Sequence, residues 1–156
     1  MAKLCKGIGT LLLALVIVVG LLMFLPSLFG KELFNVVSGS MEPEIPVGSL
    51  IMVQYEEPET IQEGEVIAFE HRGSIVTHRV VQNDIPKASL ITKGDANTQE
   101  DFEPVSYGQV IGVVQFHAPA LGAIFGALSM INGKIFLIAL AVVGALLNVL
   151  GQKLQH

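Results

Sequence analysis

The segment from Gly7 to Gly30 contains 24 consecutive residues without a charge, most of them Leu, Val and Ile. A helix needs about 20 apolar residues to cross a bilayer, so this segment is long enough to span one. A cleaved secretory signal has a shorter apolar core and a small-x-small exit site, which residues 26–30 do not offer. We predict an uncleaved transmembrane anchor over residues 7–30. Lys3 and Lys6 favour a cytoplasmic location for residues 1–6.

The other end of the chain is apolar as well. Residues 135–150 form a strongly apolar run that is short for a span, but Lys134 and Lys153 at its borders can snorkel toward the two interfaces and extend it. We predict a second transmembrane helix over residues 134–151, followed by a short tail at 152–156. The alternative is a single span with a hydrophobic tail packed on the globular part.

A separate apolar segment precedes this predicted helix. Residues 121–131 are rich in Gly and Ala and are followed by Asn132-Gly133, a pair typical of turns. We therefore assign residues 119–133 to an apolar segment lying along the membrane interface.

The polar residues are concentrated in the middle of the chain. All 14 acidic residues lie between Glu32 and Glu103, and residues 31–118 have a formal net charge of −9 with His counted as neutral. This charge argues against a nucleic-acid partner. The histidines and acids match no zinc or calcium pattern, so we expect neither a metal site nor a cofactor. Cys5 stands alone, so no disulfide is expected.

The middle of the chain has the pattern of a small β-domain. Short apolar or β-branched runs alternate with turn residues, and no amphipathic helix of 10 residues lies among them. We predict a mainly β fold, barrel-like or a sandwich, over residues 31–118. The expected strands cover residues 49–53, 66–70, 75–81, 90–93 and 110–116, with a hairpin turn at residues 71–74.

Four residues of this domain carry groups suited to acyl-transfer chemistry. Ser40 follows Gly39 in a loop rich in Gly, Ser and Pro, and a serine becomes a competent nucleophile when a neighbouring base accepts its proton. His78 lies in an apolar run, and Asp95 and Asp101 follow it. Each also has an ordinary structural explanation: a turn-forming serine, a hydrogen-bonded core histidine and an Asx turn.

Three blocks in this order resemble the motifs of type I signal peptidases. Ser38-Gly39-Ser40-Met41-Glu42-Pro43 after an N-terminal span is similar to that family's nucleophile motif. The block at residues 75–81 resembles the place where one branch carries a lysine base and the archaeal and endoplasmic-reticulum branch carries histidine. The block at residues 93–97, with Asp101 beyond it, resembles the acidic motif of that second branch, with Ala96 where a second Asn is usual.

The resemblance implies a role for each residue. Ser40 is the expected nucleophile and His78 the general base. Asp101 is favoured as the acid that orients His78, and Asp95 is a turn former or a second acidic support. The Ser38 side chain and the Ser40 backbone N–H are expected to bind the oxyanion, although Ser38 can also be an ordinary loop residue.

The resemblance also implies a membrane-bound serine endopeptidase that removes signal peptides from exported preproteins after small residues. Its partners would be signal peptides, membrane lipid, and translocation machinery or accessory subunits. The catalytic domain would be extracytoplasmic, on a multi-pass protein of the cell membrane or, in a eukaryote, of the endoplasmic reticulum. Two alternatives use the same pattern: an anchored protease for another substrate or for self-cleavage, and a non-enzymatic β-domain adaptor.

Overall fold

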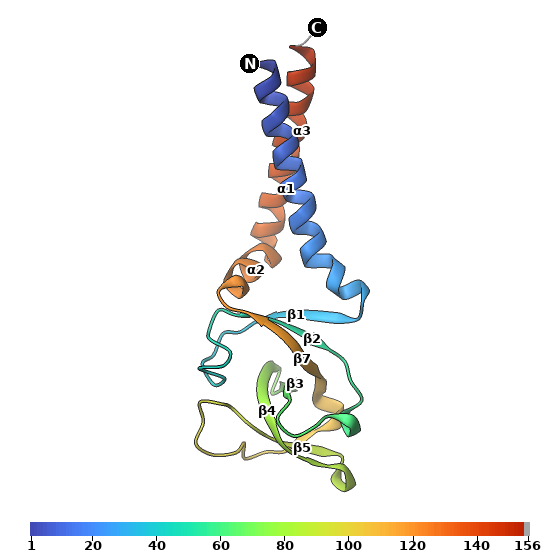
Figure 1. Ribbon diagram of the computed structural model, residues 1–156, viewed down its shortest axis with the longest axis vertical. Helices are drawn as coiled ribbons and strands as arrows, with labels where there is room; N and C mark the ends of the chain where they lie inside the picture. Colours follow the sequence, from blue (N-terminus) through green and yellow to red (C-terminus); the bar gives the residue numbers. More distant parts are fainter. Residues whose placement is uncertain (155–156) are drawn as a thin grey trace. The chain divides into compact units, whose positions relative to one another are not determined.

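The computed structural model describes residues 1–154 of the chain (Figure 1). Its residues divide into two compact units. One unit comprises residues 27–124 and contains the β-sheet. The other comprises residues 1–26 together with the segment from Phe125 onward, and it contains the long apolar helices.

Two helices of the structure are long and apolar enough to cross a membrane: α1 (Ala2–Leu28) and α3 (Ile131–Lys153). They pack against each other through glycine. A Cβ atom built on Gly9 would lie only 2.6 Å from the Gly144 carbonyl oxygen, so the two backbones approach more closely than any side chain would allow. The Asn148 side-chain amide donates a hydrogen bond of 3.1 Å to the Thr10 hydroxyl across the same contact.

Helices α2 and α3 are separated at Met130, two residues before the turn that the sequence suggests. Helix α2 (Leu121–Ser129) ends before Met130, whose extended backbone separates it from α3. The prediction of a turn at Asn132-Gly133 is wrong, because both residues belong to the first turn of α3. Gly133 is needed there for packing, since a Cβ on it would lie 2.3 Å from the Ala127 carbonyl oxygen of α2.

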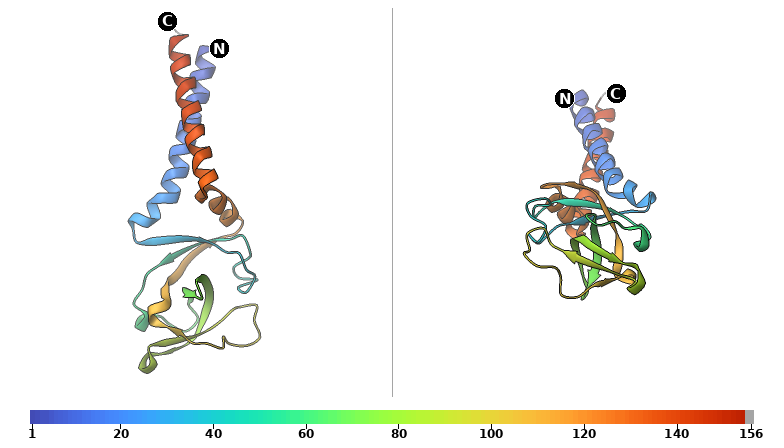
Figure 2. Two further views of the ribbon diagram at one scale, coloured as in Figure 1. Left: turned by 180° about the vertical axis from the view of Figure 1, so that it is seen from behind. Right: turned by 60° about the horizontal axis from the view of Figure 1, so that its bottom comes forward.

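The prediction of a mainly β fold with an apolar helix at each end is confirmed. Seven strands form one antiparallel sheet in the order β1-β2-β7-β3-β4-β5-β6. Figure 2 shows from two further sides that the sheet is curved. The strands are β1 (Lys31–Asn35), β2 (Leu50–Gln54), β3 (Val66–His71), β4 (Ser74–Asp84), β5 (Ser89–Lys93), β6 (Val105–Ser106) and β7 (Val110–Ala118). All five expected strands are present, whereas β1 and β6 were not predicted.

The β3–β4 hairpin has the turn expected from the sequence, and it is tight. The two strands extend to His71 and Ser74, which leaves only Arg72 and Gly73 between them. Both turn residues have positive φ angles, 51° and 77°. Such a two-residue turn matches the right-handed twist of the strands, and it sets the register along the hairpin.

The core of the β-domain consists of two apolar clusters. One is built mainly from β3, β4, β5 and β7 and includes Ile67, Phe69 and Leu90. The other includes Ile51 and Val53 of β2 and also three residues of the loop between β1 and β2, Val36, Met41 and Ile45. The second cluster therefore fixes the loop that carries Ser40.

Candidate active site

Ser40 lies in the loop between β1 and β2, in a series of turns that covers residues 38–45. The next residue, Met41, is 1% exposed, and Ile45 is 2% exposed. The Ile45 backbone N–H donates to the Met41 carbonyl at 2.8 Å. Because the buried side chains of Met41 and Ile45 anchor the loop, they hold the backbone of Ser40 on its C-terminal side.

The Ser40 backbone is attached to the turn that follows β5. The Ala96 N–H donates to the Ser40 carbonyl at 2.9 Å. Gly94 of the same turn is buried, and a Cβ on it would lie 2.6 Å from the Ser40 carbonyl oxygen and 3.0 Å from Nε2 of His78. The Ser40 carbonyl oxygen and Nε2 of His78 thus both border the space that a side chain at position 94 would fill.

His78 lies on β4 and is paired through its backbone register with Ile67 of β3. The residue is 8% exposed, and its ring packs edge-on against Phe69 with the ring centroids 6.1 Å apart. Its Nδ1 atom lies 2.5 Å from Oδ2 of Asp101. The Thr92 hydroxyl donates a second hydrogen bond of 2.6 Å to the same carboxylate oxygen.

The two ring nitrogens of His78 have different neighbours. An ionised carboxylate only accepts hydrogen bonds, so the contact with Asp101 requires the tautomer with the proton on Nδ1. In that tautomer Nε2, the nitrogen near Gly94 and the Ser40 carbonyl, can accept a proton.

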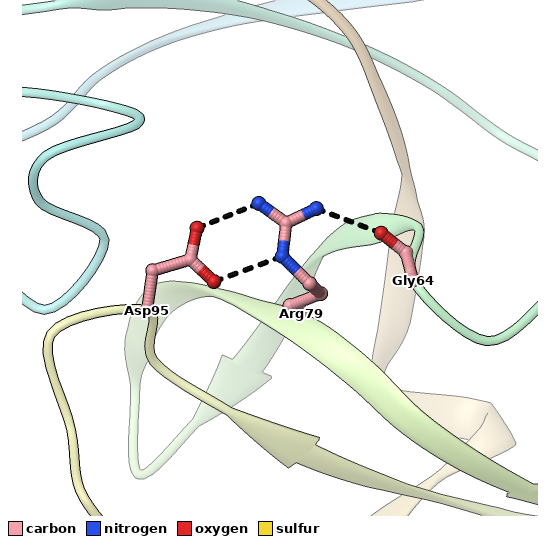
Figure 3. Close-up of polar contacts among 3 residues, drawn as sticks. All are labelled: Gly64, Arg79 and Asp95. Carbon is pink, nitrogen blue, oxygen red and sulfur yellow. Dashed lines mark hydrogen bonds and ion pairs between the residues drawn. The ribbon is translucent and has the colours of Figure 1, made fainter.

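Asp95 lies in a different environment (Figure 3). Its two carboxylate oxygens accept hydrogen bonds of 2.8 and 2.6 Å from Nε and Nη2 of Arg79. Arg79 also donates through Nη1 to the Gly64 carbonyl at 2.7 Å. The hydrogen bond to Asp95 raises the pKa of the Arg79 guanidinium further above its ordinary value. Such a two-pronged contact fixes the turn after β5 in place, next to strand β4.

Of the predicted residues, the structure therefore brings Asp101, and not Asp95, into contact with His78. Ser38 and Ser40 both line a cleft of about 430 Å³, together with Ile75 and Thr77 of β4.

Among residues 1–154, no group of three or more His, Cys, Asp or Glu side chains is arranged to hold a metal ion.

Three contributors to this geometry were not identified from the sequence. Thr92 carries the second hydrogen bond to Asp101, Gly94 provides the space between Ser40 and His78, and Arg79 holds Asp95. Arg79 is next to His78 in the sequence, and alternation along a strand places it on the opposite face, which is consistent with a supporting function. Nothing in the local pattern distinguishes Thr92 from an ordinary strand threonine.

Comparisons with known proteins match the part of the chain that holds this site. The family model described as peptidase S24-like matches residues 30–115. Signal peptidase I W of Bacillus subtilis is 45% identical over 87 residues, which cover 52% of this chain and 45% of that protein. The signal peptidase complex catalytic subunit sec11 of Sclerotinia sclerotiorum is 34% identical over 99 residues, covering 56% and 58%.

A further relative, the signal peptidase complex catalytic subunit of Pyricularia oryzae, is 34% identical over 101 residues, with coverage of 56% and 58%. The chain spans about half the length of these curated relatives. The matches confirm the resemblance to type I signal peptidases that the three sequence blocks indicate.

Proposed function

The chain belongs to the peptidase S24-like family, and we propose that it is a membrane-bound serine endopeptidase that removes signal peptides from exported or secreted preproteins. One observation carries the proposal. His78 contacts Asp101 through Nδ1, while its Nε2 faces the backbone of Ser40 across Gly94. A nucleophile, a base and an orienting acid therefore follow one another in the order that acyl transfer requires.

The proposed reaction has two steps. Ser40 Oγ attacks the scissile carbonyl carbon while Nε2 of His78 accepts the hydroxyl proton. When the tetrahedral intermediate collapses, the same nitrogen donates that proton to the leaving amine, and Ser40 retains the acyl group. Nε2 of His78 then takes a proton from the water that attacks the ester, and it returns this proton to Ser40 Oγ when the second tetrahedral intermediate collapses and releases the acid product.

The two aspartates have different roles in this proposal. Asp101 is the positioning residue of His78, because its carboxylate accepts the Nδ1 proton and stabilises the imidazolium that forms during attack. Asp95 holds the turn that contacts the Ser40 carbonyl, through its ion pair with Arg79. The reaction needs no metal or cofactor, since imidazole supplies the proton transfer.

The oxyanion that forms on the substrate requires hydrogen-bond donors. The Ser40 backbone N–H and the Ser38 hydroxyl are the proposed pair, since both residues line the cleft in which the scissile bond would lie. Loss of one such donor typically lowers the rate by about 100-fold to 1,000-fold. Ser38 is exposed at the mouth of the cleft, so its hydroxyl is free to turn toward a bound substrate.

The substrate in this proposal is an extended segment with a small residue such as alanine at the cleaved position. An extended peptide gains backbone hydrogen bonds by pairing with a strand edge, and pockets along the edge then select among side chains. The proposed clients are signal peptides of secretory preproteins. Because one relative is named as a subunit of a signal peptidase complex, accessory subunits and translocation machinery are further proposed partners.

The proposed topology follows from the two apolar helices. α1 and α3 both cross the bilayer, both ends of the chain are cytoplasmic, and the β-domain is extracytoplasmic, in the cell membrane or, in a eukaryote, in the endoplasmic-reticulum membrane. A tag placed after His156 should be protected from added protease in sealed vesicles that expose the β-domain. Digestion of that tag in the same vesicles would contradict the second span.

Cleavage of a matched pair of model preproteins tests the activity. The detergent-solubilised chain should cleave a preprotein with alanine at the cleaved position, and the new N-terminus should be the one expected from that position. A preprotein with a large charged residue there should remain uncut, and so should the first substrate with a His78→Ala variant. If neither preprotein is cut by the wild-type chain, the adaptor interpretation replaces this one.

A further inference from the structure

Strand β4 has an unpaired edge beside the candidate site. On one side, β3 pairs with β4 from Ser74 to Arg79. On the other side, β5 pairs with β4 only from Arg79 to Asp84. Within residues 1–154, no strand pairs with the second edge of residues 74–78. This short free edge ends at His78, and it is suited to accept one more extended segment.

A cavity lies on each face of the sheet beside this free edge. The Ile75 and Thr77 side of β4 borders the cleft of about 430 Å³ that Ser38 and Ser40 line, which we call the Ser40 pocket. Because successive side chains of a strand alternate, Val76 and His78 lie on the opposite face. There they line a second cavity of about 340 Å³, which does not include Ser40.

The second cavity, which we call the Phe102 pocket, is lined by three apolar side chains and by charged or titratable ones: Phe69, Val76 and Phe102, and His71, Arg72, His78, Asp101 and Glu103. Phe69 of β3 is 4% exposed and forms one wall, and Val76 forms another. Phe102 is fully exposed and stands where the cavity meets solvent. At the rim, Arg72 and Glu103 form an ion pair of 2.8 Å. An aromatic side chain fully exposed to water beside an apolar cavity gains stability when a ligand covers it.

A peptide paired with the free edge must place its side chains alternately in the two cavities. In the proposed reaction, the residue whose carbonyl Ser40 attacks would place its side chain in the Ser40 pocket, which Ser38 and Ser40 line. The residue immediately before it therefore faces the Val76 and His78 side of the strand.

We propose that the Phe102 pocket binds the side chain of the substrate residue that immediately precedes the cleaved residue, and that it selects a large apolar or aromatic side chain there. This inference rests on the proposed function. The pocket has room for an aromatic ring, and the Phe69 and Phe102 rings offer it apolar contact. The enzyme would thus combine a small residue at the cleaved position with a large one just before it.

Two reporter preproteins that differ only at this position test the pocket. Both have alanine at the cleaved position, and the preceding residue is Phe in one and Ser in the other. We expect kcat/KM of the wild-type chain to be about 10-fold higher for the Phe reporter, in line with the discrimination that apolar pockets achieve. In Phe102→Ala, the ratio of the two values should fall to about 1.

Phe116→Ala provides the matched control, because Phe116 is also an exposed aromatic residue but lies on β7, outside the Phe102 pocket. It should retain the 10-fold ratio. Equal cleavage of the two reporters by the wild-type chain, or a full preference in Phe102→Ala, would overturn the assignment of the pocket while leaving the proposed activity standing. Failure of the wild-type chain to cut either reporter would overturn both.

Discussion

The space at Gly94 provides the sharpest test of how Ser40 and His78 act together. In Gly94→Ala, the new Cβ would lie 2.6 Å from the Ser40 carbonyl oxygen, 2.8 Å from the Asn97 side-chain nitrogen and 3.0 Å from Nε2 of His78. Ordinary van der Waals contact begins at 3.4 Å, so the Ser40 backbone would have to move away by about 0.8 Å. A displacement of this size at a reacting group typically lowers the rate by about 100-fold.

We therefore expect kcat for a model preprotein to fall by about 100-fold in Gly94→Ala. Overpacking of this kind also destabilises a fold by about 1–3 kcal/mol, so circular dichroism at the assay temperature must show that the variant is folded. Gly108→Ala is the matched control, because a Cβ there meets nothing within 4 Å. It should retain kcat within about two-fold of wild type. A folded Gly94→Ala chain with the wild-type kcat would refute the placement of Ser40 and His78 on either side of Gly94.

Two further substitutions distinguish the roles of the two aspartates, and a third tests the packing of the two long helices. Asp101→Asn replaces one carboxylate oxygen by an NH2 donor, and with that group toward Nδ1 it favours the wrong tautomer of His78. We expect kcat in steady-state assays to fall by about 10³-fold to 10⁴-fold, and a loss below 10-fold would contradict the pairing. Asp95→Asn should lower kcat less than Asp101→Asn does while reducing the melting temperature, and the reverse order of kcat losses would exchange the two roles. Gly9→Leu should disrupt helix packing at Gly144 and lower the melting temperature in detergent, whereas an unchanged value would contradict that close contact.

Much of the architecture could be predicted from the chain because its patterns are strong. The 24-residue uncharged segment predicts a spanning helix by length alone, and five of the seven strands follow from runs of β-branched residues. Strand β1 was not predicted because Lys31 and Glu32 begin it directly after the apolar segment. Strand β6 contains only two residues, too few to show an alternating pattern.

The residues of the site could be predicted from the sequence, but the contacts among them could not. The sequence blocks point to Ser40, His78 and two aspartates, but spacing alone does not tell which carboxylate meets the imidazole. That choice depends on tertiary contacts: Arg79 occupies both oxygens of Asp95, while Thr92 helps to hold Asp101. The steric role of Gly94 likewise depends on atoms that come from three separate segments.

The rate at which Ser40→Ala cleaves a model preprotein, measured beside the wild-type chain and Ser38→Ala, tests the central claim most directly. If Ser40 is the nucleophile, Ser40→Ala should give no product above the uncatalysed background, and Ser38→Ala should retain a slow reaction that is about 100-fold to 1,000-fold below wild type. Cleavage at the same bond and at the wild-type rate by Ser40→Ala would contradict the proposed mechanism.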